Sequence, residues 1–242
     1  MKALILSLSC VWGADVLAQS STDKVQPSTG RTMTQEKQQN MTPKQALLRL
    51  KEGNKRFLTN TMIARDYRKQ AKIASYGQFP FAVVLNCMDS RSVPELFFDQ
   101  GLADLFTLRV AGNVLNDDIL GSMEFATKVV GTPLIVVLAH TSCGAAAGAC
   151  DDVKLGHLTG LLDKMKPAVE PAMKDTDTKQ CSKPELVNAI AKQNALLVAR
   201  AISDQSPIIK ELIESKKVGL VAGMHDIKTG EVQFFEEERL MP

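Results

Sequence analysis

The chain has 242 residues, of which 45% are hydrophobic, 23% charged and 5% aromatic, and its formal net charge is +2. That length and apolar content suffice for one well-buried domain of ordinary size. A nearly balanced charge and few aromatic side chains give no reason to expect binding to nucleic acid or to an anionic membrane.

The first 18 residues have the character of an export signal. Lys2 precedes a mainly apolar run over residues 3–18, and Val16-Leu17-Ala18 places small or medium side chains where a signal peptidase reads them. We therefore predict a signal peptide over residues 1–18 and export, with a periplasmic location. The run is too short and interrupted for a good membrane span, so no membrane association is expected after cleavage. The alternative is a buried N-terminal helix.

Residues 19–41 are rich in Ser, Thr, Gln and Lys and are almost devoid of apolar side chains. Such a segment cannot bury enough surface to fold, so we predict a flexible linker. Ordered structure is expected from Thr42, which forms a capping box with Gln45 and is followed by Pro43 in the first helical turn. This helix, extending to about residue 59, is predicted to form an N-terminal helical arm.

Apolar runs predict the strands of the remaining chain, residues 42–242, which we expect to form one α/β domain. Four continuous runs have the length of buried strands: 81–86, 105–110, 133–139 and 218–222. Helices are predicted over 117–130, from a capping box at 182–185 to about 203, and from 206 onward. Continuous apolar strands separated by helices indicate a parallel sheet with helices on both faces. A turn at 226–230 predicts an added antiparallel edge strand.

Metal-binding side chains follow two of these strands. Cys87 comes directly after the first strand, and His140 and Cys143 follow the third. In open α/β sheets, sites form outside the carboxyl ends of strands. Each residue alone is more often a packed core residue. Together they suit zinc, which takes thiolate and imidazole ligands in tetrahedral geometry, and three protein ligands leave a fourth position free.

The segments around these residues resemble the beta-class carbonic anhydrases. Cys-x-Asp-x-Arg at 87–91 is followed by His-x-x-Cys at 140–143, and residues 92–95, 98–101, 109–113 and 143–145 match the family as well. The resemblance covers about residues 42–240. It implies a mainly parallel four-stranded sheet with an antiparallel strand, zinc as cofactor, a homodimer or tetramer, and reversible hydration of carbon dioxide to bicarbonate.

The resemblance also implies roles for residues beside the metal ligands. Arg91 would keep Asp89 oriented and ionised, so that Asp89 orients a zinc-bound hydroxide; the same carboxylate would become the fourth zinc ligand in a closed state. Gln100 would donate to an oxygen of carbon dioxide or bicarbonate. Gly144 begins a small-residue helix whose N-terminus would favour bicarbonate, and close packing is an equally good explanation for that glycine.

Some members of the family have a second bicarbonate site that locks the closed state. It uses a Trp three residues before the first zinc cysteine, a late Tyr and an Arg. Here Val84 occupies the Trp position, both tyrosines are early, and only Arg109 matches. We therefore predict no such locked state, and an open resting site in which Asp89 pairs with Arg91.

Two cysteines lie outside the metal pattern. Removal of the signal with Cys10 leaves Cys150 and Cys181 free to pair in an oxidising compartment, so we predict a disulfide between them. Other functions stay open at this stage: hydrolysis of CS₂ or COS on the same scaffold, or a non-catalytic zinc protein. A thiol redox protein is not favoured, because the chain has no Cys-x-x-Cys pair.

Overall fold

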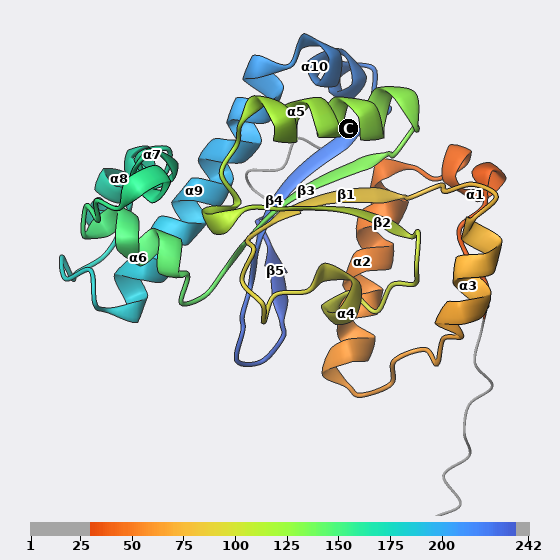
Figure 1. Ribbon diagram of the computed structural model, residues 1–242, viewed down its shortest axis with the longest axis horizontal. Coiled ribbons are helices and arrows are strands. Elements are labelled where there is room, and N and C mark those ends of the chain that lie inside the picture. The colour runs from red at the N-terminus through yellow and green to blue at the C-terminus, as the bar shows by residue number, and fades with distance from the viewer. Residues whose placement is uncertain (1–29, 236–242) are drawn as a thin grey trace, which may run out of the picture.

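A five-stranded sheet forms the centre of the computed structural model, which describes residues 30–235. The predicted signal peptide and the first part of the predicted linker lie outside these residues. The strand order is β2-β1-β3-β4-β5 (Figure 1). The strands are β1 (Ala82–Asn86), β2 (Leu105–Arg109), β3 (Leu134–His140), β4 (Gly219–His225) and β5 (Val232–Phe234). The first four are mutually parallel and β5 is antiparallel to β4, which confirms the predicted fold class.

Helices cover both faces of the sheet, because the strand side chains are apolar on both sides. On one face, Val83 and Val137 belong to a core that includes side chains of the helices α5, α6, α8, α9 and α10. On the other face, Val84 and Val136 pack with Leu50 of α2 and Phe97 of α4. The helices are α1 (Gln35–Gln39), α2 (Pro43–Leu58), α3 (Tyr67–Ala74), α4 (Pro94–Phe97), α5 (Asp117–Glu124), α6 (Gly144–Cys150), α7 (Gly156–Asp163), α8 (Val169–Lys174), α9 (Pro184–Gln205) and α10 (Pro207–Glu214).

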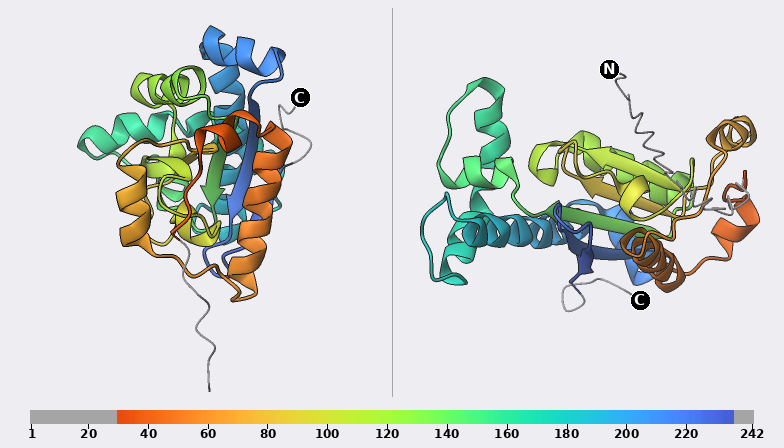
Figure 2. Two further views of the ribbon diagram at one scale, coloured as in Figure 1. Left: turned by 90° about the vertical axis from the view of Figure 1, so that its right-hand side faces the viewer. Right: turned by 90° about the horizontal axis from the view of Figure 1, so that it is seen from below.

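The helices also extend the molecule at both ends of the sheet. Helices α6, α7 and α8 gather beyond one end, and α1 and α3 lie at the other (Figures 1 and 2). Since α6 follows β3 directly, the first group marks the carboxyl ends of the parallel strands. Among the helices of residues 30–235, none is long and apolar enough to cross a bilayer.

Ordered structure begins earlier than the sequence predicted. Helix α1 lies within the expected linker, and it is held by two buried side chains. Met33 joins the core beneath α2, and Gln38 donates a hydrogen bond from Nε2 to the Pro80 oxygen at 2.8 Å. The linker prediction counted apolar residues and so missed the anchoring that a single Met and a buried amide provide. The capping box of α2 at Thr42 is present as predicted.

Three element boundaries differ from the prediction. Helix α9 begins at Pro184 with Lys183 as its N-cap and no capping side chain, so the predicted box at 182–185 is wrong. The predicted helix over 117–130 is α5 followed by a π-helical segment, Phe125–Val129. Strand β4 continues to His225, three residues beyond the predicted end. Because β4 extends this far, His225 lies opposite His140 in the sheet.

The predicted disulfide is confirmed. Cys150, the last residue of α6, is bonded to Cys181, with a Cα–Cα distance of 5.6 Å and a sequence separation of 31 residues. The bond closes the excursion that contains α7 and α8 and returns the chain to the start of α9. It is therefore a covalent tie at the end of the helix that follows Cys143.

Removing this bond is expected to destabilise the domain. A cross-link that closes a loop of this length restricts the unfolded chain and contributes about 2–4 kcal/mol. We predict that a Cys150→Ala/Cys181→Ala variant loses that amount in urea unfolding, and that a non-thiol reductant destabilises the wild-type protein but not the variant. Equal unfolding midpoints for the two proteins under oxidising conditions would contradict this prediction.

Candidate metal centre

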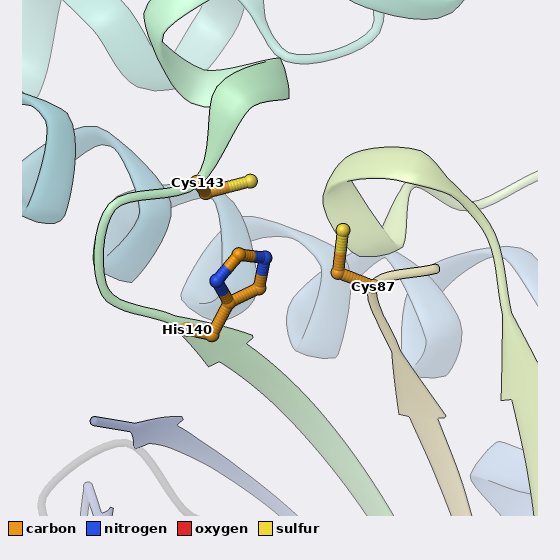
Figure 3. Close-up of side chains that lie close together, drawn as sticks. All are labelled: Cys87, His140 and Cys143. Carbon is orange, nitrogen blue, oxygen red and sulfur yellow. The ribbon is translucent and has the colours of Figure 1, made fainter. Parts of the chain in front are cut away.

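Three buried side chains converge at the carboxyl ends of β1 and β3. The Cys87 and Cys143 sulfurs and a ring nitrogen of His140 all lie within 4.8 Å of one another. Figure 3 shows the three side chains pointing toward a common centre, with Cys87 after β1, His140 at the end of β3 and Cys143 before a helix. The three predicted zinc ligands are thus brought together by the fold.

Strand pairing places the first two ligands. Strands β1 and β3 are parallel neighbours with Asn86 opposite Leu138, so Cys87 and His140 leave the sheet side by side. The third ligand needs a sharp turn, in which Ser142 has a φ of 55°. Its amide donates to the Asn188 side-chain oxygen at 2.8 Å, which ties this turn to α9.

The His140 ring has one nitrogen free for a metal. Nδ1 lies 2.9 Å from the Thr141 carbonyl oxygen, which can only accept a hydrogen bond, so Nδ1 carries the proton. Nε2 is buried and has no hydrogen-bond partner. A buried acceptor without a hydrogen-bond partner destabilises a folded protein. Nε2 of His140 would gain a partner if it bound a metal, and the Nδ1 hydrogen bond fixes the tautomer that metal binding needs.

A glycine supports the Cys87 sulfur. The Gly112 amide donates to this sulfur at 3.3 Å, and Gly112 has a φ of 65°. A Cβ at this position would lie 2.3 Å from the Met165 sulfur, so a larger residue would force that side chain to shift and would strain the backbone. The Asn194 side chain of α9 holds the Gly112 oxygen at 2.8 Å.

The two thiols have opposite pKa shifts. The hydrogen bond from the Cys143 thiol to Cys87, with help from the Gly112 amide, holds the pKa of Cys87 well below its ordinary value. The same pairing, together with burial, raises the pKa of Cys143. These shifts favour a thiolate at Cys87, and binding of a cation by both sulfurs would require Cys143 to lose its proton as well.

Asp89 and Arg91 form a two-pronged ion pair beside the ligands. Arg91 donates from Nε to Oδ1 of Asp89 at 2.9 Å and from Nη2 to Oδ2 at 2.7 Å. These bonds hold the pKa of Asp89 far below its usual range, so the carboxylate is ionised at neutral pH. Its Oδ2 lies 3.8 Å from Nε2 of His140, within reach of a group bound at the metal position.

A family model described as carbonic anhydrase matches residues 82–232, more than half of the chain. The chain belongs to the beta class of carbonic anhydrases. Carbonic anhydrase 2 of Mycobacterium tuberculosis is 41% identical over 137 residues, which cover 54% of this chain and 66% of that protein. A carbonic anhydrase of Mycolicibacterium smegmatis is 37% identical over the same shares of the two chains.

Solved beta-carbonic anhydrases share the fold. A tetrameric enzyme of the ascomycete Sordaria macrospora aligns with a TM-score of 0.64 and 24% identity, covering 69% of this chain and 85% of that one. The beta-carbonic anhydrase CcaA aligns with a TM-score of 0.64 and 23% identity, covering 79% and 95%. At these identities the structures establish the architecture, and the site rests on this chain's own geometry.

Gln100 and Gly144 were predicted to contact the substrate of the carbonic anhydrase site, and the structure shows the surroundings of each. Gln100 is buried, and its amide is occupied: Nε2 donates to the Phe98 oxygen at 2.6 Å, and Oε1 accepts from Nε of Arg49 at 3.0 Å. Gln100 therefore links α2 to the turn before β2, and its contact with substrate stays a prediction. Gly144 follows Cys143 in an exposed position, and a Cβ there would meet nothing within 4 Å, so close packing does not explain this glycine.

Two positions of this chain correspond to the family's second bicarbonate site, Val84 in place of the Trp and Arg109, and both side chains make other contacts. Val84 is fully buried among apolar side chains. Arg109 donates to two backbone oxygens of the metal loop, from Nε to Cys87 at 3.1 Å and from Nη2 to Asp89 at 2.6 Å. Arg109 thus braces the loop that carries Cys87 and Asp89, a role that the sequence did not predict.

A polar network beneath the metal loop was also missed. Ser92 lies 3.0 Å from Nδ1 of His225 and bonds to Asn86, and all three residues are buried. Burial and the nearby His140 lower the pKa of His225 to about 4, so its ring is neutral near pH 7. Sequence reasoning assigned Ser92 only to a family match and assigned His225 no functional role, because the contact between them depends on where the fold places β4. The other histidine outside the motif, His157, is exposed on α7.

The metal assignment predicts one zinc ion per chain. Cys87→Ala, His140→Ala and Cys143→Ala should each abolish stoichiometric zinc in the purified protein, because each removes one of three protein ligands. Mass-spectrometric metal analysis measures the content directly. The Cys150→Ala/Cys181→Ala variant is the matched control, since it loses two cysteines outside the cluster and should keep its zinc. Full zinc in both the Cys87 and the Cys143 variants would refute the assignment.

Proposed function

We propose that this chain catalyses the reversible hydration of carbon dioxide to bicarbonate and a proton, with zinc held by Cys87, His140 and Cys143. The observation that carries the proposal is the buried Cys-His-Cys cluster with an unpartnered His140 nitrogen, set beside an ionised Asp89. Membership of the carbonic anhydrase family and the names of the mycobacterial relatives support the same reaction.

The donor set fits zinc. Two sulfurs and one imidazole nitrogen are ligands that Zn²⁺ prefers, and three of them leave a position for water or substrate. When bound there, zinc would supply the Lewis acidity that makes water a nucleophile near neutral pH. Two thiolates neutralise more of the metal's charge than three neutral histidines do, so the protein's own polar groups have more to contribute.

Asp89 is the side chain placed to assist the attack on carbon dioxide. It is ionised, its two oxygens are fixed by Arg91, and Oδ2 faces the free nitrogen of His140. A carboxylate held in this way accepts a hydrogen bond from the attacking oxygen and directs its lone pair toward carbon dioxide. The pairing with Arg91 also supports the open resting arrangement, and loss of that pairing would free Asp89 to take the fourth ligand position.

The assembly is proposed as a homodimer or tetramer. The supporting comparison is the Sordaria macrospora enzyme, whose structure is described as tetrameric. Size-exclusion chromatography with light scattering at several protein concentrations measures the mass directly, and a monomer at all of them would reject this proposal.

The catalytic proposal predicts that Asp89→Asn retains zinc but loses activity. The amide keeps the size of the side chain but removes the charge, so carbon dioxide hydration should fall by about 100-fold or more. Stopped-flow hydration assays on zinc-loaded protein measure the loss. Asp163→Asn is the matched control. It removes the charge of an exposed carboxylate at the end of α7, which pairs with Lys166, and this variant should hydrate carbon dioxide at the wild-type rate. Undiminished hydration by Asp89→Asn would contradict the mechanism, and faster turnover of COS or CS₂ by the wild-type protein would favour the hydrolase alternative.

Export to the periplasm is proposed from the signal-like residues 1–18, and a disulfide is the kind of bond that an oxidising compartment maintains. When the full chain is expressed in a bacterium with a working secretion pathway, intact-mass analysis should find a mature protein that begins at Gln19. A chain in the cytoplasm that retains residues 1–18 would reject the proposal.

A further inference from the structure

We propose that His225 is a positioning residue of the metal centre, acting through Ser92 to hold together the two loops that carry the zinc ligands. The inference rests on the proposed zinc site, and it concerns residues outside the metal-binding motif. It begins from a group of buried polar side chains, Asn86, Ser92 and His225, for which the proposed reaction has no use.

The loop with Cys87, Asp89 and Arg91 is closed at its base by a side-chain clamp. Asn86 and Ser92, which flank this loop, are both fully buried. The Asn86 Nδ2 donates to the Ser92 carbonyl oxygen at 2.9 Å and to its Oγ at 3.1 Å. The first ligand and the Asp–Arg pair therefore lie on a five-residue loop whose two ends are joined in the core.

His225 connects this clamp to the second ligand loop. Its Nδ1 lies 3.0 Å from the Ser92 Oγ, and its backbone oxygen accepts a hydrogen bond from the Thr141 amide at 2.9 Å. In the sheet His225 is the register partner of His140. One residue of β4 thus contacts the segment after His140 through its backbone and the segment after Arg91 through its ring.

The ring is itself held in place. It stacks on Phe97 of α4 with ring centroids 4.1 Å apart and an angle of 20° between the planes. This stacking fixes the direction of Nδ1, so the ring transmits position between the loops. A zinc site requires ligand atoms placed within tenths of an ångström, and residues that orient ligands typically change metal affinity 10–100-fold when removed.

Two substitutions of His225 separate the hydrogen bond from the stacking. His225→Phe keeps an aromatic ring against Phe97 but removes Nδ1. His225→Asn loses the ring but places an amide where Nδ1 lies, within reach of Ser92. If positioning depends on the hydrogen bond, His225→Phe should release zinc to a competing chromophoric chelator about tenfold faster than wild type, and His225→Asn should release it at nearly the wild-type rate.

Ser92→Ala should have the effect of His225→Phe, and the double variant should lose no more than either alone, because both remove the same link. Ser206→Ala is the matched control. Ser206 is equally buried and also uses its Oγ in a hydrogen bond, to Glu124, but it caps α10 away from the metal site. It should lower stability without changing the rate of zinc release.

Cobalt substitution supplies a readout that loss of stability alone does not move. The thiolate-to-cobalt absorption band should shift or weaken in His225→Phe and Ser92→Ala and stay unchanged in Ser206→Ala. Wild-type zinc release and cobalt spectra in both Ser92→Ala and His225→Phe would overturn the inference. A wild-type protein that binds neither metal would instead refute the proposed zinc site, so the two failures are distinguishable.

Discussion

Parallel pairing of β1 with β3 is the constraint on which the rest of this structure depends. It sets Asn86 opposite Leu138, and as a result Cys87 and His140 emerge at the same edge of the sheet. Every residue of both strands is buried, so neither strand exposes a side chain to solvent. The sheet is therefore stabilised by apolar burial on both faces, and the polar chemistry is confined to the loops at its carboxyl edge.

The metal centre is supported in successive shells. His140, Cys87 and Cys143 point inward, and each is oriented by a neighbour: Thr141 on the ring, Gly112 on the Cys87 sulfur, and the Ser142–Asn188 bond on the turn before Cys143. Around them, Arg109, Asn86 and Asn194 donate hydrogen bonds to backbone oxygens of the loops. Because α9 supplies Asn188 and Asn194, and the disulfide fixes the chain ahead of α9, packing far from the zinc ligands still bears on their geometry.

Sequence reasoning succeeded where a local pattern carries the information. Cys87 and His140 could be placed because each ends a continuous apolar run, and Thr42 because a capping box is a contact between near neighbours. It failed where a role depends on a residue distant in the chain. Ser92 contacts Nδ1 of His225, 133 residues later, and Gln100 accepts a hydrogen bond from Arg49 of α2; no local pattern reveals either contact. The order of residues 33–38 likewise depends on distant contacts, those of Gln38 with Pro80 before β1 and of Met33 with the core beneath α2.

The central claim is that two sulfurs and one imidazole of this chain bind zinc and leave a fourth position for a light atom. Zinc K-edge X-ray absorption on the purified wild-type protein tests it most directly. The account predicts two sulfur neighbours at about 2.3 Å, one imidazole nitrogen at about 2.0–2.1 Å, and one further nitrogen or oxygen neighbour. A spectrum fitted by four sulfurs, or by nitrogen and oxygen neighbours alone, would contradict it.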